Sequence, residues 1–261
     1  MHHSDRDISL EATTSINKGA VTARFLIPNK VNSMAQELDT HSPRYDLHRL
    51  VVLMILAGAF TSAIGISISV WAEYQHIGTE VFFRRADYLG DYIHSPLAYI
   101  YNLSLVIAGS CILLSMYGLF RLKLGYYSHY IAIAGFWVGT SIILIGVFPI
   151  NYLDEHRIVS TSFLIGTFVL YLLTISLRLN HKGLCSTPLF LISVLGFISA
   201  TGLIYQLDWQ TLDFTPCLHG QDEFCWVSLN MWFQTNITMF WCVVLAFSVR
   251  KLSNENYTPD T

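Results

Sequence analysis

Long uncharged apolar stretches alternate with short polar segments over most of this chain. Six stretches of 18 to 24 residues contain no Asp, Glu, Lys or Arg: 51–71, 97–120, 130–149, 160–177, 189–207 and 229–249. A helix needs about 20 apolar residues to cross a hydrocarbon core of roughly 30 Å. Each stretch is close to that length, so the pattern predicts six transmembrane segments.

The six segments are expected to be helices that pack as one bundle. Backbone groups inside a bilayer must satisfy their own hydrogen bonds, and a helix does so within a single segment. The alternating pattern of a membrane β-barrel is absent from the sequence. We predict an all-α polytopic membrane protein with a mobile cytosolic extension at 1–46, a six-helix transmembrane domain at 47–251 and a cytosolic tail at 252–261.

The composition favours a membrane protein over a soluble bundle of buried helices. Hydrophobic residues make up 53% of the chain and charged residues 13%, against roughly 25% charged residues in soluble domains. A soluble bundle also needs polar helix faces that water can wet, and the six stretches offer none.

Lys and Arg gather in alternate connections, and this asymmetry predicts the orientation. Twelve of the fifteen basic residues fall in the terminal segments and in the second and fourth connections; the exceptions are Arg84, Arg85 and Arg157. Cytoplasmic loops are enriched in Lys and Arg. We therefore expect both termini in the cytoplasm, and the first, third and fifth connections (loops one, three and five) on the outer side.

Two of the five cysteines, Cys217 and Cys225, lie in loop five. An oxidising outer compartment permits a disulfide between them, and closing so short a loop would contribute roughly 2–3 kcal/mol. Two unpaired thiols are the alternative. The CxxC spacing typical of a zinc site is missing.

Small residues recur at four-residue spacing in several of the stretches. Examples are Gly135 with Gly139, and Gly196 with Ala200. Small side chains let helices approach closely in lipid. Contact between helices of one bundle explains this pattern, and homodimerisation is the alternative.

Several classes of function leave no trace in the sequence. Ionisable residues at mid-membrane are the usual mark of proton relays and ion pathways, and the six stretches have none. No nucleotide-binding loop of Walker type is present. We expect no ion-coupled pump, no cofactor, no metal and no nucleic-acid partner.

Polar residues concentrate in the outer loops, beside the ends of the apolar stretches. The candidate ligand-binding residues are Asp87, Asp91, His94, Asn151, Asp154 and His156. A histidine near carboxylates at the membrane boundary can act as a general base, a metal ligand or a ligand-binding group. The alternative is structural, with these residues capping helices, as Asp154 can, or pairing with nearby arginines.

Loops one and three are expected to meet at the outer rim of the bundle. Asp87 and Asp91 would share one face if their segment is helical, and His94 and His156 could complete a metal site with them. Loop three is short, so His156 should lie near one of the two carboxylates. Such a pair favours a charged imidazole, which suits a lipid phosphate better than a metal.

Two stretches resemble the bacterial Domain of Unknown Function 998 family. The counterparts of the family's SDLG…P…N…G pattern are Asp87, Leu89, Gly90, Pro96, Asn102 and Gly109. The counterparts of its G-FP…H pattern are Gly146, Phe148, Pro149 and His156. The last apolar stretch also resembles the family's last helix.

The resemblance covers roughly residues 50–250, with some departures. Ala86 replaces the usual Ser, and Phe233 and Gln234 stand where the family often has an acidic–Arg pair. The layout is also similar to the eukaryotic Frag/DRAM/Sfk family, whose members are tied to membrane-lipid handling and autophagy. The resemblance implies an uncharacterised multi-pass protein of the bacterial plasma membrane and names no reaction.

Two functional hypotheses follow. In the first, a non-catalytic membrane protein binds a lipid headgroup or a membrane-protein partner at its outer face. In the second, an intramembrane lipid hydrolase or transferase uses the Asp and His residues of loops one and three. A catalytic metal would require two histidines and an aspartate to converge on one point, so the positions of His94 and His156 discriminate between these readings.

Overall fold

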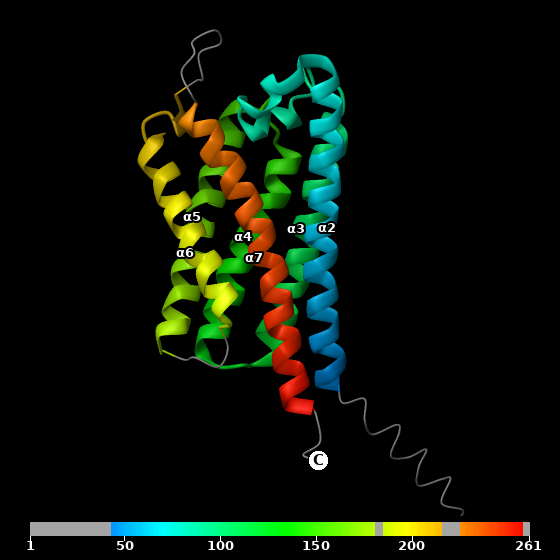
Figure 1. Cartoon of the computed structure of the whole chain (residues 1–261), viewed down its shortest axis with the longest axis vertical. Helices are drawn as coiled ribbons and strands as arrows, with labels where there is room; N and C mark the ends of the chain where they lie inside the picture. Colours follow the sequence, from blue (N-terminus) through cyan, green and yellow to red (C-terminus); the bar gives the residue numbers. More distant parts are fainter. Residues whose placement is uncertain (1–42, 181–184, 216–224, 258–261) are drawn as a thin grey trace, which may run out of the picture. The chain divides into compact units, whose positions relative to one another are not determined.

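Six long helices account for the six apolar stretches (Figure 1). The computed structural model describes residues 43–180, 185–215 and 225–257. Its helices are α2 (Pro43–Ile77), α3 (Ala98–Leu122), α4 (Tyr126–Val147), α5 (Leu153–Asn180), α6 (Thr187–Gln206) and α7 (Trp226–Tyr257). All six are long and apolar enough to cross a membrane, which confirms the predicted all-α, six-span fold. The extension expected at residues 1–46 lies almost wholly outside the described residues.

Local sequence signals fix where the helices begin and end. Lys123 closes α3 in the left-handed region, with φ 51°, and Gly125, with φ 118°, precedes α4. Pro149 cannot continue α4, and it pushes Phe148 before it toward extended backbone. Ser186 caps α6 by accepting a hydrogen bond from the backbone N–H of Leu189 at 3.4 Å.

The helices form a closed ring. Each helix contacts its neighbour in chain order, and α2 also contacts α7. Large aromatic side chains fill the ring and satisfy their polar atoms across it. The Tyr171 hydroxyl lies 2.9 Å from the Thr238 hydroxyl, and the Trp241 indole N–H donates to Ser193 at 2.9 Å. The interior thus joins α5, α6 and α7 by hydrogen bonds as well as by packing.

Glycines permit the closest helix approaches within this ring. A Cβ on Gly109 of α3 would lie 2.8 Å from the carbonyl oxygen of Gly139 in α4. A Cβ on Gly196 of α6 would lie 2.5 Å from the ring of Tyr171 in α5. These glycines therefore permit close contact between helices of one bundle, which is the explanation that the sequence analysis favoured over homodimerisation.

Short elements shape the end of the bundle that holds loops one, three and five, which we call the outer end after the predicted orientation. Loop one contains the 3-10 helices η1 (Gly78–Phe82) and η2 (Ala86–Gly90). Loop five contains a two-stranded hairpin, β1 (Leu207–Asp208) and β2 (Asp213–Phe214), with Asp208 opposite Asp213. The Asn102 amide of α3 donates to the Gly90 carbonyl at 3.0 Å, and so ties η2 to the ring.

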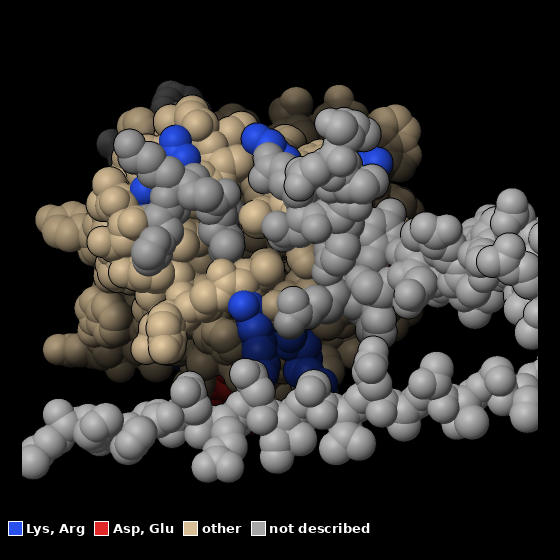
Figure 2. Space-filling view, turned by 90° about the horizontal axis from the view of Figure 1, so that it is seen from below, with Lys and Arg blue, Asp and Glu red and all other residues tan. Residues whose placement is uncertain are grey.

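The two ends of the ring differ in charge. α2 begins and α7 ends at the same end, which is the lower end in Figure 1. Figure 2 views that end and shows Lys and Arg side chains across it, with little acidic surface. Basic residues described there are Arg49, Arg121, Lys123, Arg178, Arg250 and Lys251. The opposite, outer end carries most of the described carboxylates.

Candidate functional site

An ion-pair chain joins three segments at the outer end. Arg85, which directly precedes η2, donates through Nη1 to Asp213 of β2 at 2.8 Å. Its Nε and Nη2 donate to the two carboxylate oxygens of Asp87. Arg157 of α5 donates to Asp213 through Nη2 at 2.7 Å and through Nε at 3.1 Å. Asp213 therefore holds loop one against α5, and both arginines are engaged by carboxylates.

His156 lies beside these ion pairs, as expected from the short loop three. Pro149 ends α4, and the Tyr152 N–H bonds to the Pro149 carbonyl. The Phe148 carbonyl accepts a hydrogen bond from Nδ1 of His156 at 2.9 Å. The other ring nitrogen, Nε2, is 3.6 Å from an oxygen of Asp87. We call Arg85, Asp87, His156, Arg157 and Asp213 the outer cluster.

The surroundings of the outer cluster keep its carboxylates ionised. Burial alone would raise the pKa of Asp87, but His156 and Arg85 outweigh burial and hold that pKa below its usual range. Burial likewise opposes ionisation of Asp213, and hydrogen bonds from Arg157, the Phe214 N–H and Arg85 lower its pKa. An Asp87 with a lowered pKa is a poor general base.

Asp91, His94 and Asn151 form a separate tie between loops one and three. The Asn151 amide donates to Asp91 at 2.8 Å, and the Asn151 side-chain oxygen accepts from the Tyr92 N–H at 3.0 Å. The His94 ring bonds to the other Asp91 oxygen, and the His94 side chain is 68% exposed. Asp91 closes η2 in extended backbone, so Asp87 and Asp91 do not share a helical face.

Asp154 stands apart from both groups. Its side chain is 93% exposed, and its nearest ionic partner is Arg157 at 3.9 Å. It lies in the first turn of α5, where a carboxylate interacts favourably with the helix dipole. This position fits the structural role considered for it.

The structure does not bring the candidate metal ligands together. His94 pairs with Asp91, whereas His156 pairs with Asp87. Within residues 43–180, 185–215 and 225–257, no three His, Cys, Asp or Glu side chains form a group that could hold a metal ion. The convergence that a metal-dependent hydrolase requires is therefore not met by these ligands.

A partly open cavity of about 150 Å³ extends from the outer cluster into the ring. Arg85, Asp87 and His156 line its polar end. Its apolar walls come from α3, α4, α5, α6 and α7, and include Leu105, Ile142, Leu164, Leu203 and Met231. A water needs only roughly 10–15 Å³ of such space, so the cavity has room for several waters or part of an acyl chain.

Three buried polar atoms on residues that line this cavity lack a hydrogen-bond partner. They are Nε2 of His156, Oγ1 of Thr161 and Oε1 of Gln234. The three residues are 2%, 7% and 3% exposed. Buried polar groups are nearly always paired, so a bound polar group would satisfy bonding capacity that these atoms leave unused, although Nε2 of His156 is also 3.6 Å from Asp87.

A Ser–His–Asp relay is not assembled in this cavity, although Ser160 also lines it. The Ser160 hydroxyl donates to the Arg157 carbonyl at 3.2 Å. The two nitrogens of His156 face the Phe148 carbonyl and Asp87. A nucleophilic serine needs a histidine nitrogen as its base, and neither nitrogen adjoins Ser160 here.

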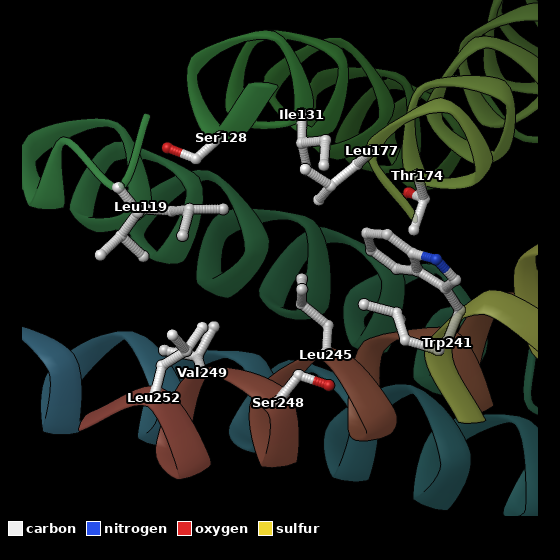
Figure 3. Close-up of a pocket in the computed structure, with 12 residues that line it drawn as sticks. Leu119, Ser128, Ile131, Thr174, Leu177, Trp241, Leu245, Ser248, Val249 and Leu252 are labelled. Atoms are coloured by element: carbon white, nitrogen blue, oxygen red, sulfur yellow. The ribbon is translucent and has the colours of Figure 1, made fainter. Parts of the chain in front are cut away.

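A second cavity lies at the basic end, between α3, α4, α5 and α7 (Figure 3). It measures about 20 Å³, enough for about one water. Figure 3 shows leucines, Ile131, Val249 and the Trp241 ring around it, and Ser128 at its edge. Its size and apolar lining suit a packing defect rather than a binding site.

Sequence reasoning missed the inner part of the outer-end cavity. Thr161 and Gln234 lie within apolar stretches, where single polar residues carry no pattern. The sequence marks Gln234 only as a departure from a family motif. Asp213 offered no more signal than the other acids of loop five. The predicted disulfide also stays a prediction, because Cys217 lies outside the described residues.

Comparison with known proteins gives a family. Residues 57–248 match the family model described as protein of unknown function (DUF998). Neither a curated protein nor a solved structure matches the chain. The matched range contains the outer cluster, the cavity and nearly all of the ring. This multi-pass membrane protein therefore belongs to the DUF998 family.

Proposed function

We propose that this chain is a non-catalytic protein of the bacterial plasma membrane that binds a membrane lipid in its outer-end cavity. One observation carries the proposal. A single cavity joins the charged outer cluster to apolar walls inside the ring, and residues that line it hold three buried polar atoms without a hydrogen-bond partner. A membrane lipid matches this arrangement, because its polar headgroup is followed by an apolar acyl chain.

Charge supports the orientation that the proposal requires. The end where α2 begins is rich in Lys and Arg, and the outer end has only Arg84, Arg85 and Arg157 among the described residues. By the positive-inside rule, this asymmetry supports a cytoplasmic position for the basic end. The polar end of the cavity would then lie at the outer leaflet.

The contacts of the arginines change the expected headgroup chemistry. Arg85 and Arg157 are already paired with Asp87 and Asp213. A phosphate would have to break these pairs to reach a guanidinium, and it would meet two carboxylates there. The cavity therefore favours a polar group of low charge over the lipid phosphate that the sequence suggested.

A membrane-protein partner and a lipid hydrolase are the competing functions. A partner needs a docking face, and the cavity by itself offers none. A hydrolase without metal needs an activated nucleophile, and the side chains of Ser160 and His156 are committed to backbone carbonyls. Release of free fatty acid from bilayer lipids by the purified protein, abolished by His156→Ala, would favour the enzyme.

The test fills the cavity and measures lipid that co-purifies with the protein. Leu203 of α6 lines the cavity and is 4% exposed, whereas Leu195 of the same helix is 47% exposed. We expect Leu203→Phe to reduce tightly bound lipid in detergent-purified protein, as counted by mass spectrometry. Leu195→Phe is the matched control and should leave it unchanged. Equal lipid content in the two variants would contradict the proposal, as would unchanged content in His156→Ala.

A further inference from the structure

The orientation of the Gln234 amide is fixed by its neighbour on α5. The Thr167 hydroxyl donates its only proton to the Leu164 carbonyl at 2.9 Å. It can therefore only accept from Gln234, whose nitrogen lies 3.2 Å away. The side-chain oxygen of Gln234 is left without a partner. A carbonyl oxygen only accepts hydrogen bonds, so the group that completes it must be a donor.

Thr161 offers the complementary group. Ser160 and Thr235 also line the cavity, but their hydroxyls donate to the carbonyls of Arg157 and Met231. The Thr161 hydroxyl makes no such bond. Its proton is free for an acceptor, while Gln234 requires a donor. A trans secondary amide directs its N–H and its C=O to opposite sides, so one linkage between the two side chains supplies both the donor and the acceptor.

These two side chains lie deeper than the charged end of the cavity. Thr161 follows His156 by five residues on α5, which is about 7.5 Å along the helix axis. The Gln234 amide lies deeper still, because it donates to Thr167, six residues beyond Thr161 on α5. Beyond His156, the wall that surrounds them is apolar, with Leu105, Ile142 and Leu203. This depth suits the linkage between a polar head and an acyl chain.

An ester linkage or a phosphate fits this place less well. An ester has no hydrogen to donate, so it would leave the Gln234 oxygen buried and unpaired. A phosphate adds negative charge near Asp87, and the neighbouring Arg85 and Arg157 are already paired. Leaving one buried acceptor unpaired weakens binding by roughly tenfold.

We propose that the outer-end cavity recognises an amide-linked acyl chain, with Gln234 accepting from the amide N–H and Thr161 donating to the amide C=O. This specificity rests on the proposed lipid-binding function and names its ligand class. Gln234 and Thr161 are then the residues that distinguish amide-linked from ester-linked lipids. His156, at the polar end, contacts the head of the same molecule.

The experiment compares two amphiphiles that differ only at the linkage. Dodecanoyl ethanolamide has an N–H where 2-hydroxyethyl dodecanoate has an oxygen, and both keep the same chain and terminal hydroxyl. Native mass spectrometry of the full-length protein in detergent gives the apparent Kd of each, with dodecyl phosphate as a third probe. We expect the amide to bind roughly tenfold more tightly than the ester, and more tightly than the phosphate.

Variants assign the preference to named atoms. Gln234→Met keeps the side-chain length but removes the acceptor, and it should abolish the difference between amide and ester while retaining binding of both. Thr201→Val removes an exposed hydroxyl of α6 outside the cavity and should keep the difference. If Gln234→Met does not fold, Thr161→Val should weaken the amide's advantage in its place.

The outcomes separate this inference from the proposed function. Equal binding of amide and ester by the wild-type protein, or tighter binding of dodecyl phosphate, overturns the amide specificity and leaves lipid binding standing. A preference that persists in both Gln234→Met and Thr161→Val also overturns it. Failure of all three amphiphiles to bind overturns both proposals.

Discussion

Replacing Asp213 by Asn should loosen the outer end of the bundle. Asp213 accepts three hydrogen bonds from Arg85 and Arg157, at 2.7 to 3.1 Å. Asparagine keeps the shape but loses the charge, and its amide nitrogen would face a guanidinium. Arg85 would keep Asp87 as a partner, whereas the remaining ionic contact of Arg157 is the exposed Asp154 at 3.9 Å.

The degree of burial sets the magnitude. Removing one partner of a buried ion pair costs about 3–5 kcal/mol, and an exposed pair contributes about 0–1 kcal/mol. The side chains here are 20% exposed for Asp213, 11% for Arg85 and 26% for Arg157. We therefore expect a loss of about 2–3 kcal/mol in the free energy of unfolding. That loss corresponds to a Tm lower by roughly 4–12 °C.

Thermal unfolding of detergent-purified protein measures this effect. Asp154→Asn is the matched control, because Asp154 faces the same Arg157 but is 93% exposed. The control should change stability by less than about 0.5 kcal/mol. If Asp213→Asn unfolds at the same temperature as Asp154→Asn, then Asp213 does not hold loop one against α5, and the account of the outer cluster fails.

Four further predictions follow from the fold. Reporter fusions in the loops after α3 and α5 and at the C-terminus should all report the cytoplasm, and an external signal from any of them would reverse the orientation. Cys217 and Cys225 should be found bridged by non-reducing mass spectrometry after expression in an oxidising compartment, where two alkylated thiols would reject the bond. Gly196→Val should lower the Tm by the equivalent of about 1–3 kcal/mol, because its side chain would overlap the Tyr171 ring; an unchanged Tm would show that α5 and α6 can separate freely. The pKa of Asp213 is lowered in the folded protein. Its contribution to stability is therefore full above the unfolded pKa of about 3.9 and is lost as the pH falls through the folded value. The free energy of unfolding should accordingly fall less steeply with decreasing pH in Asp213→Asn than in the wild type.

The residues that resemble the two family motifs have structural roles that their spacing alone did not show. Asn102 holds the carbonyl of Gly90 and so fixes η2 on α3. Pro149 ends α4, and the Phe148 carbonyl there anchors His156. A Cβ on Gly146 would meet the Asn102 carbonyl at 2.6 Å. The two motifs thus help to position Asp87 and His156, which line the outer-end cavity.

The sequence by itself determined the six spans, because each apolar stretch is long enough to cross a bilayer and its backbone must be helical there. Charge patterning likewise indicated which ends share a side, and short loop three was enough to bring His156 beside loop one. These properties depend on local composition and chain length. They need no knowledge of how the helices pack.

The tertiary structure alone decided which polar residues act together. Asp87 and Asp91 are four residues apart, yet η2 sends Asp87 to Arg85 and His156, and Asp91 to His94 and Asn151. Asp213 bonds to Arg85 from more than a hundred residues away. Gln234 lines the cavity, and its amide nitrogen donates to Thr167 on another helix. Such partners are set by the order in which helices close the ring, and hydropathy carries no information about that order.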